Sequence, residues 1–289
     1  EHLSVNFFAE IFSNLGELLF DASDAKEGDI VTTIEPTVAR MLDKVLEDAQ
    51  KQWHSNITGG IIINPKNGEI LALNVVPSFD LNDRTGIDID SFRNPLVENV
   101  YEMGSIIKPI TMAAGIDAGV VAPSSTYYDP GCIQLSDYTI CNYDGKGRGT
   151  VPMQEILSQS LNTGVAHIAS LLGKDRFRKY FTNIKLGSET GIDLPSEGHG
   201  LVKNLESPRE LEYANASFGQ GIALTPIATI RALSTLANGG VLVTPHLVKK
   251  IENTNGEERD VSYPDGDRVF KKETTEEVTR MLVKVVDTA

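Results

Sequence analysis

Residues 101–109 read Tyr-Glu-Met-Gly-Ser-Ile-Ile-Lys-Pro, and they open an apolar helical pattern that runs from about Ser105 to Gly119. Ser105 and Lys108 are three residues apart, so in a helix they lie on one face, one turn from each other. Pro109 fits a helix start, because proline is tolerated in the first turn of a helix but not in later turns. The stretch therefore predicts a serine hydroxyl close to a lysine amine at the beginning of a helix.

A serine and a lysine in this arrangement can form an acyl-transfer site. A serine hydroxyl is a weak nucleophile until a base removes its proton. Lys108 is flanked by Ile106, Ile107 and Ile110, and loss of hydration lowers the pKa of a lysine enough for it to act as that base. The pattern alone is weak, because residues 23–26, Ser-Asp-Ala-Lys, also match it in an acidic stretch where a lysine stays protonated.

A second short pattern, Ser-x-Asn, occurs at Ser160 and Asn162, 55 residues after Ser105. It lies where a polar stretch meets Asn-Thr-Gly between two helical segments. The same pattern at residues 4–6 has no such surroundings. An isolated match is more often a helix cap or a solvated polar residue than a catalyst, so the setting decides in favour of Ser160.

Composition excludes several other classes of function. The chain has 289 residues, with 26 Lys and Arg against 40 Asp and Glu, and a formal net charge of −14. This balance argues against a nucleic-acid partner, because phosphates are bound by clustered basic residues. Hydrophobic residues at 40% and charged residues at 23% are typical of a globular protein. No apolar run reaches the length of about 18 residues that spans a bilayer.

The sequence predicts no metal and no cofactor. Its histidines are scattered without the spacing of metal ligands: His2, His54, His167, His199 and His246. Neither a GxSxG elbow nor a phosphate-binding GxxxxGK[ST] loop is present, and residues 219–221, Gly-Gln-Gly, are too short for a dinucleotide loop.

Strand-like patterns occur towards both ends of the chain and helical patterns between them, which favours an α+β fold with one sheet built partly from each end. Residues 59–64 and 69–76 predict a hairpin around the turn at 65–68. The other expected strands are 30–34 and 241–251, and the expected helices are 36–53, 105–119, 151–173, 174–182, 225–238 and 273–286. Residues 1–20 carry an apolar stripe at helical spacing, which we interpret as a packing face.

Two cysteines, Cys132 and Cys141, flank a stretch that alternates apolar and polar residues around Ser136 and Asp137. This pattern predicts a hairpin that places the cysteines opposite each other. From the residues alone, a disulfide and two free thiols both remain open.

Several segments occur in the order and spacing of one known family. Residues 101–109 are similar to its active-serine motif, and residues 160–164, Ser-Leu-Asn-Thr-Gly, to its second motif. Further similar segments are residues 60–72, 77–80, 138–145, and 217–221 ahead of 225–226. Over roughly residues 28–289 the chain resembles the transpeptidase domain of the class B penicillin-binding proteins. The resemblance implies a β-lactamase/transpeptidase-like α+β fold, with an antiparallel sheet flanked by helices and a mostly helical subdomain, lacking its last strands.

The resemblance also implies a function, that of a peptidoglycan D,D-transpeptidase. Ser105 would attack the stem peptide between its last two D-alanines, Lys108 would be the general base, and Ser160 would relay a proton to the leaving nitrogen. Asn162 would bind the substrate amide and help to hold Lys108. The expected substrate-binding segment also contains Gly219, Gln220 and Gly221. Stem peptides and β-lactam antibiotics are the expected ligands, with no cofactor.

The resemblance further predicts where the protein works. Cell-wall enzymes act outside the cytoplasmic membrane, where a disulfide between Cys132 and Cys141 persists, so we expect that disulfide. Residues 1–28 would be a linker or the end of an amino-terminal pedestal that leads to a membrane anchor, and residues 29–289 the transpeptidase domain. The expected partners are membrane proteins of the divisome or elongasome.

One motif of the family is missing. Neither Lys-Thr-Gly nor Lys-Ser-Gly occurs anywhere in the sequence. We expect that the chain stops short of the strand that carries this motif, so that the domain is incomplete at its carboxyl end; a degenerate homologue is the alternative. That strand would supply half of the oxyanion hole, so we expect this chain alone to be weak or inactive.

Two other functions are compatible with the same motifs. A class A serine β-lactamase would carry a Glu-x-x-Leu-Asn pentapeptide, but residue 158 is Ser where that glutamate would stand. A non-catalytic β-lactam-binding or sensor module on the same fold would keep its acyl group, and the sequence does not distinguish it from a transpeptidase.

Overall fold

The computed structural model describes residues 28–79, 92–264 and 266–288. The expected helix over residues 1–20 lies outside the described residues. The described residues divide into two compact units, one from residues 28–79, 92–99, 189–198 and 244–264 and the other from 100–188, 199–243 and 266–288. Among the described residues, no helix combines the length and the apolar character that a membrane span requires.

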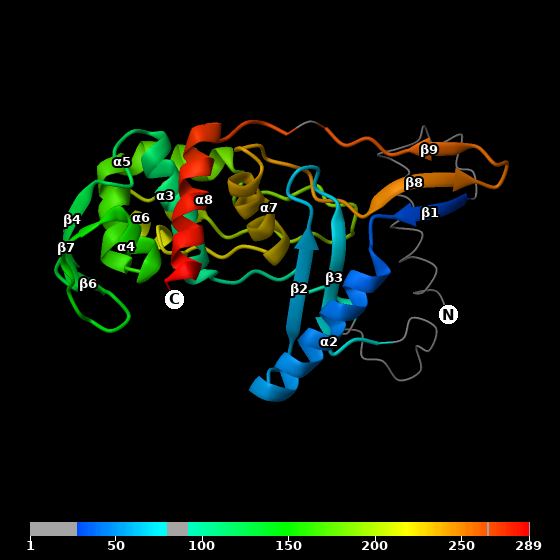
Figure 1. Cartoon of the computed structure of the whole chain (residues 1–289), viewed down its shortest axis with the longest axis horizontal. Helices are drawn as coiled ribbons and strands as arrows, with labels where there is room; N and C mark the ends of the chain where they lie inside the picture. The colour runs from blue at the N-terminus through cyan, green and yellow to red at the C-terminus, as the bar shows by residue number, and fades with distance from the viewer. Residues whose placement is uncertain (1–27, 80–91, 265, 289) are drawn as a thin grey trace. The chain divides into compact units, whose positions relative to one another are not determined.

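The first unit contains a three-stranded antiparallel sheet built from both ends of the chain (Figure 1). Its strands are β1 (Gly28–Thr32), β8 (Val248–Asn253) and β9 (Glu258–Asp260), in the order β1-β8-β9. The predicted pairing of an early strand with a late one is confirmed.

The strand expected over residues 241–251 begins only at Val248. Backbone N–H groups at its start have side-chain partners in place of strand partners: the Asp193 carboxylate accepts from Leu247 N at 2.8 Å and from Val248 N at 2.6 Å. Pro245 has no N–H group to offer. A long-range side chain has therefore shortened this strand.

The other elements of the first unit are a helix and a hairpin, both close to the predicted ranges. Helix α2 (Pro36–Trp53) begins after Glu35, whose carboxylate accepts from Thr37 N, and Pro36 occupies its first turn. It packs on the hairpin of β2 (Thr58–Ile63) and β3 (Ile70–Val76) (Figure 1). A glycine is required in the turn, because a Cβ at Gly68 would lie 2.2 Å from Thr244 O.

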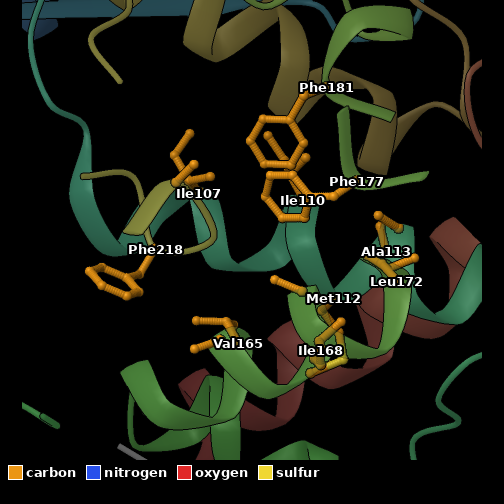
Figure 2. Packing of buried hydrophobic residues seen from close by; sticks show 14 of the residues in the cluster. Ile107, Ile110, Met112, Ala113, Val165, Ile168, Leu172, Phe177, Phe181 and Phe218 are labelled. Carbon is orange, nitrogen blue, oxygen red and sulfur yellow. The ribbon is translucent and has the colours of Figure 1, made fainter. Parts of the chain in front are cut away.

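The second unit is mostly helical. Its helices are η2 (Gly104–Ile107), α3 (Lys108–Asp117), α4 (Met153–Ser158), α5 (Asn162–Asn183), η3 (Lys203–Glu206), α6 (Glu210–Ala216), α7 (Pro226–Ala237) and α8 (Lys272–Asp287). Helix α3 is the centre of the core and buries seven of its ten residues. Figure 2 shows apolar side chains of α3, such as Ile110 and Met112, among those of α5, such as Val165 and Ile168.

The helix expected over residues 151–173 is wrong in one respect that matters for the site. Residues 149–152 form strand β7 (Gly149–Pro152), and the helix is broken between Ser158 and Asn162. Ser160 has a left-handed backbone with φ 53°, which ends the first helix. The predicted boundary between the helices 151–173 and 174–182 is confirmed as a kink, because Gly173 in α5 has a φ of 72°.

The second unit also contains two small antiparallel sheets of two strands each. Strand β4 (Thr126–Asp129) pairs with β7, and β5 (Cys132–Leu135) pairs with β6 (Tyr138–Cys141). Cys132 is directly opposite Cys141 in the register, and the structure joins them by a disulfide with an S–S distance of 2.07 Å. Helices and antiparallel strands together confirm the α+β class.

Candidate active site

Ser105 lies in the short 3-10 turn η2, directly ahead of α3. Its side chain is exposed, whereas Ile107 and Lys108 are buried and continue into the core. The preceding Gly104 takes a left-handed φ of 62°, which turns the chain into the helix. The Ser105 hydroxyl is therefore presented to solvent from a turn that is anchored in the core by Ile107 and Lys108.

Residues 219–221 lie beside this turn. Gly104 N donates to Gly219 O at 3.1 Å, and a Cβ on Gly219 would lie only 2.3 Å from Gly104 O. Gly221 N donates to the Glu102 carboxylate at 2.8 Å, and Gln220 is exposed. The structure thus brings the predicted segment next to Ser105 and gives Gly219 a packing role that the sequence did not indicate.

Lys108 contacts Ser160, although 52 residues separate them. Its Nζ donates to Ser160 O at 2.5 Å and to Ser160 Oγ at 2.9 Å. Lys108 is only 2% exposed, and burial lowers its pKa from 10.5 to about 8, because the apolar surroundings penalise the charged form. The left-handed turn at Ser160 puts both of its oxygens within reach of the same amine.

Asn162 begins α5 and is held by the disulfide hairpin. Its Nδ2 donates to Cys141 O at 2.9 Å. In the described part of the chain, both hydrogen bonds of the Lys108 amine go to Ser160. The role of Asn162 in holding the lysine stays a prediction.

Three buried polar residues lie behind the Ser160 turn, and sequence reasoning gave them no role. They are Asp129, Asn142 and Thr163, each at most 3% exposed. Thr163 Oγ1 donates to Asp129 Oδ1 at 2.7 Å, and Asn142 Nδ2 donates to both Asp129 carboxylate oxygens at 3.1 and 3.0 Å. In the sequence, only the position of Thr163 inside the Ser-Leu-Asn-Thr-Gly segment could have indicated a role for one of these residues.

Within the residues that the structure describes, no group of three or more His, Cys, Asp and Glu side chains is arranged to hold a metal ion. His167 stacks on Tyr127 with a centroid distance of 5.7 Å, and burial lowers its pKa.

A family model and similar curated proteins place the chain in the same family. The model of the penicillin binding protein transpeptidase domain matches residues 58–289. Stage V sporulation protein D from Bacillus subtilis is 34% identical over 233 residues, which cover 80% of this chain and 36% of that protein. A peptidoglycan D,D-transpeptidase FtsI homolog from Chlorokybus atmophyticus is 32% identical over 238 residues, covering 76% of this chain and 35% of that protein. The chain thus spans about a third of the length of these relatives.

A solved structure agrees. Penicillin binding protein 3 from Mycobacterium tuberculosis, complexed with aztreonam, superposes with a TM-score of 0.84 at 26% identity, covering 90% of this chain and 58% of that one. The fold expected from the sequence is confirmed by this likeness.

Proposed function

Because this chain belongs to the penicillin-binding protein transpeptidase family, we propose that it is a serine D,D-transpeptidase domain that cross-links peptidoglycan stem peptides. The observation that carries the proposal is that a buried lysine, three residues after an exposed serine, contacts a second serine. The similarity to the peptidoglycan D,D-transpeptidase FtsI homolog of Chlorokybus atmophyticus supports peptide cross-linking as the reaction.

In the first half-reaction, Ser105 forms an acyl-enzyme. Its Oγ attacks the carbonyl carbon between the last two D-alanines, and Lys108 accepts the hydroxyl proton. The new C–O bond replaces the C–N bond, and the terminal D-alanine leaves with a proton on its nitrogen. With its pKa lowered to about 8, about one Lys108 in ten is neutral at pH 7 and able to accept that proton.

Ser160 carries the proton to the leaving group. Its Oγ is 2.9 Å from Lys108 Nζ, within reach for direct transfer. In the second half-reaction the amine of another stem peptide attacks the acyl carbon, a C–N bond replaces the C–O bond, and the proton returns to Ser105. Each half-reaction therefore conserves the proton within the three side chains and the substrate.

Binding and charge stabilisation involve the groups around Ser105. The Ser105 backbone N–H is one oxyanion donor, and Asn162 together with Gly219, Gln220 and Gly221 binds the peptide. The sequence contains no Lys-Thr-Gly or Lys-Ser-Gly, and loss of one oxyanion donor typically costs about a hundredfold to a thousandfold in rate. We therefore expect slow acylation by this chain alone.

The ligands follow from the same chemistry. β-Lactams present a strained amide to the serine. The similar penicillin binding protein 3 of Mycobacterium tuberculosis has a solved structure in complex with the β-lactam aztreonam. Peptidoglycan lies outside the cytoplasmic membrane, so the domain works at that outer face. Membrane proteins of the divisome or elongasome are its proposed recruiting partners.

The test is covalent labelling with a fluorescent penicillin over hours, read on a gel and by intact mass. The chain, Ser105→Ala and Ser23→Ala are compared, the last because residue 23 begins the other Ser-x-x-Lys. We expect labelling of the chain and of Ser23→Ala, and none of Ser105→Ala. A folded chain that takes no label, or equal labelling of Ser105→Ala, would refute the proposal.

A further inference from the structure

A buried carboxylate lies at the end of β4. Asp129 is 0% exposed, and its oxygens accept from four groups: Gly131 N at 2.9 Å, Asn142 Nδ2 at 3.0 Å, Arg148 N at 3.1 Å and Thr163 Oγ1 at 2.7 Å. All of these donors are neutral. A buried charge is costly unless hydrogen bonds compensate it, so the arrangement is stable only with its donors in place.

This carboxylate and Asn142 cap α5 from another part of the chain. The residue at the N-cap of α5 is Leu161, which provides no side-chain hydrogen bond. Instead, Thr163 N donates to Asn142 Oδ1 at 3.3 Å, and Thr163 Oγ1 donates to Asp129. The first N–H groups of a helix need such partners, and negative charge near them is favourable. The start of α5 is thus fixed by residues 129 and 142.

The start of α5 in turn fixes the Ser160 turn. Ser160 comes two residues before Asn162, and its φ of 53° costs about 1 kcal/mol for a residue other than glycine. Such a conformation persists only where its surroundings hold it. On one side Ser160 is held by Lys108, and on the other by the helix that begins at Asn162.

We propose that Asp129 is a positioning residue for acyl transfer: through Thr163 and Asn142 it fixes the start of α5, and thereby the contact between Ser160 and Lys108. The inference rests on the proposed function for its catalytic consequence. Its structural part, the link from Asp129 to the Ser160 turn, does not. The two parts are tested by different measurements.

Asp129→Asn keeps the shape of the side chain and replaces one acceptor oxygen with an NH₂ group. That group faces donors, Arg148 N–H or the Asn142 amide, so at least one hydrogen bond is lost. A displacement of about 1 Å at a catalytic group slows a reaction by about a hundredfold. We expect the acylation rate constant to fall about tenfold to a hundredfold.

A matched control exists in the other unit. Asp193 also accepts only neutral donors in the described chain, Leu247 N, Val248 N and Tyr263 Oη. Asp193 is half-buried, so Asp193→Asn should destabilise the fold as well, but by less than Asp129→Asn. Well below its melting temperature, it should leave the acylation rate constant unchanged.

Thr163 provides the second pair of variants in case Asp129→Asn folds poorly. Thr163→Val removes the hydroxyl that binds Asp129 and should slow acylation, whereas Thr163→Ser keeps the hydroxyl and should restore the rate. A variant carrying both Asp129→Asn and Thr163→Val should be slower by less than the product of the two effects, because both changes break one contact.

Hydrogen exchange measured by mass spectrometry gives a readout that needs no activity. In Asp129→Asn, exchange of the peptide over residues 159–165 should accelerate about tenfold or more while the peptide over α3 is unchanged. Asp193→Asn should leave the 159–165 peptide at the wild-type rate. Wild-type exchange of this peptide in a folded Asp129→Asn would overturn the link. Faster exchange with an unchanged acylation rate would overturn the catalytic role, and failure of the wild-type chain to label would instead refute the proposed function.

Discussion

The pH dependence of acylation follows directly from the burial of Lys108. The general base is the neutral amine, so the rate follows the neutral fraction of Lys108. Burial lowers the pKa from 10.5 to about 8. At pH 7 the neutral fraction is about one in ten, against about one in three thousand for a hydrated lysine, so burial raises the fraction of competent enzyme about 300-fold. The perturbation that tests this account is a change of pH.

The assay is the second-order rate constant for labelling by a fluorescent penicillin between pH 6 and pH 9.5. We expect the constant to rise about tenfold from pH 6 to pH 7 and to level off above about pH 8, since the neutral form then predominates. Thermal melts at each pH show that the protein stays folded. Lys108→Arg is the control variant, because a guanidinium keeps its proton throughout this range. It should label at least a hundredfold more slowly at every pH.

Two results would refute the reasoning. A rate that is flat from pH 6 to pH 8 would mean that a neutral Lys108 is not required. A rate that still rises about tenfold per pH unit up to pH 9.5 would mean that the lysine is hydrated in the working protein, which contradicts its burial.

Three further predictions follow from the same contacts. Because burial lowers the pKa of Lys108, the wild type is least stable below about pH 8, and its free energy of unfolding rises between about pH 8 and pH 10.5. Lys108→Met removes this penalty, so at pH 7 its free energy of unfolding should change by a gain of about 3 kcal/mol and a loss of about 2 kcal/mol for two lost hydrogen bonds. Chemical denaturation of the variant should show no rise in stability between pH 8 and pH 10.5. Ser160→Ala loses the proton relay but not the Ser160 backbone carbonyl contact, so the labelling constant should fall about a hundredfold or more with little change in melting temperature. Gly219→Ala places a Cβ 2.3 Å from Gly104 O at a φ of 76°, so it should cost more than about 2 kcal/mol in denaturant unfolding and slow labelling as well; a wild-type melting curve would contradict the packing.

Local patterns in the sequence were sufficient for much of the fold. Helix α2 follows from a proline at its first position and an apolar period up to Trp53. The hairpin between the cysteines follows from alternation around a turn, which sets Cys132 opposite Cys141 without further information. The closeness of Ser105 and Lys108 is likewise a property of one helical turn.

Features that depend on distant residues were not accessible in this way. The break at Ser160 depends on Lys108, 52 residues away, because an isolated serine has no preference for φ 53°. The close approach of Gly219 to Gly104 appears in the sequence only as one glycine among 25. In the sequence, an aspartate ahead of a proline, such as Asp129, is typical of a turn. Its burial depends on the packing of β4 against α5, where Thr163 donates to it.

The central claim is that Ser105 carries the acyl group in peptide transfer. The most direct measurement is mass spectrometry of the chain after incubation with a thioester that mimics the acyl donor and with a D-amino acid as acceptor. The account predicts an adduct with the mass of the acyl group on the proteolytic peptide that contains Ser105, which disappears as the acyl–D-amino acid product accumulates. An adduct on another residue, or a penicillin adduct on Ser105 with neither donor adduct nor product, would contradict it.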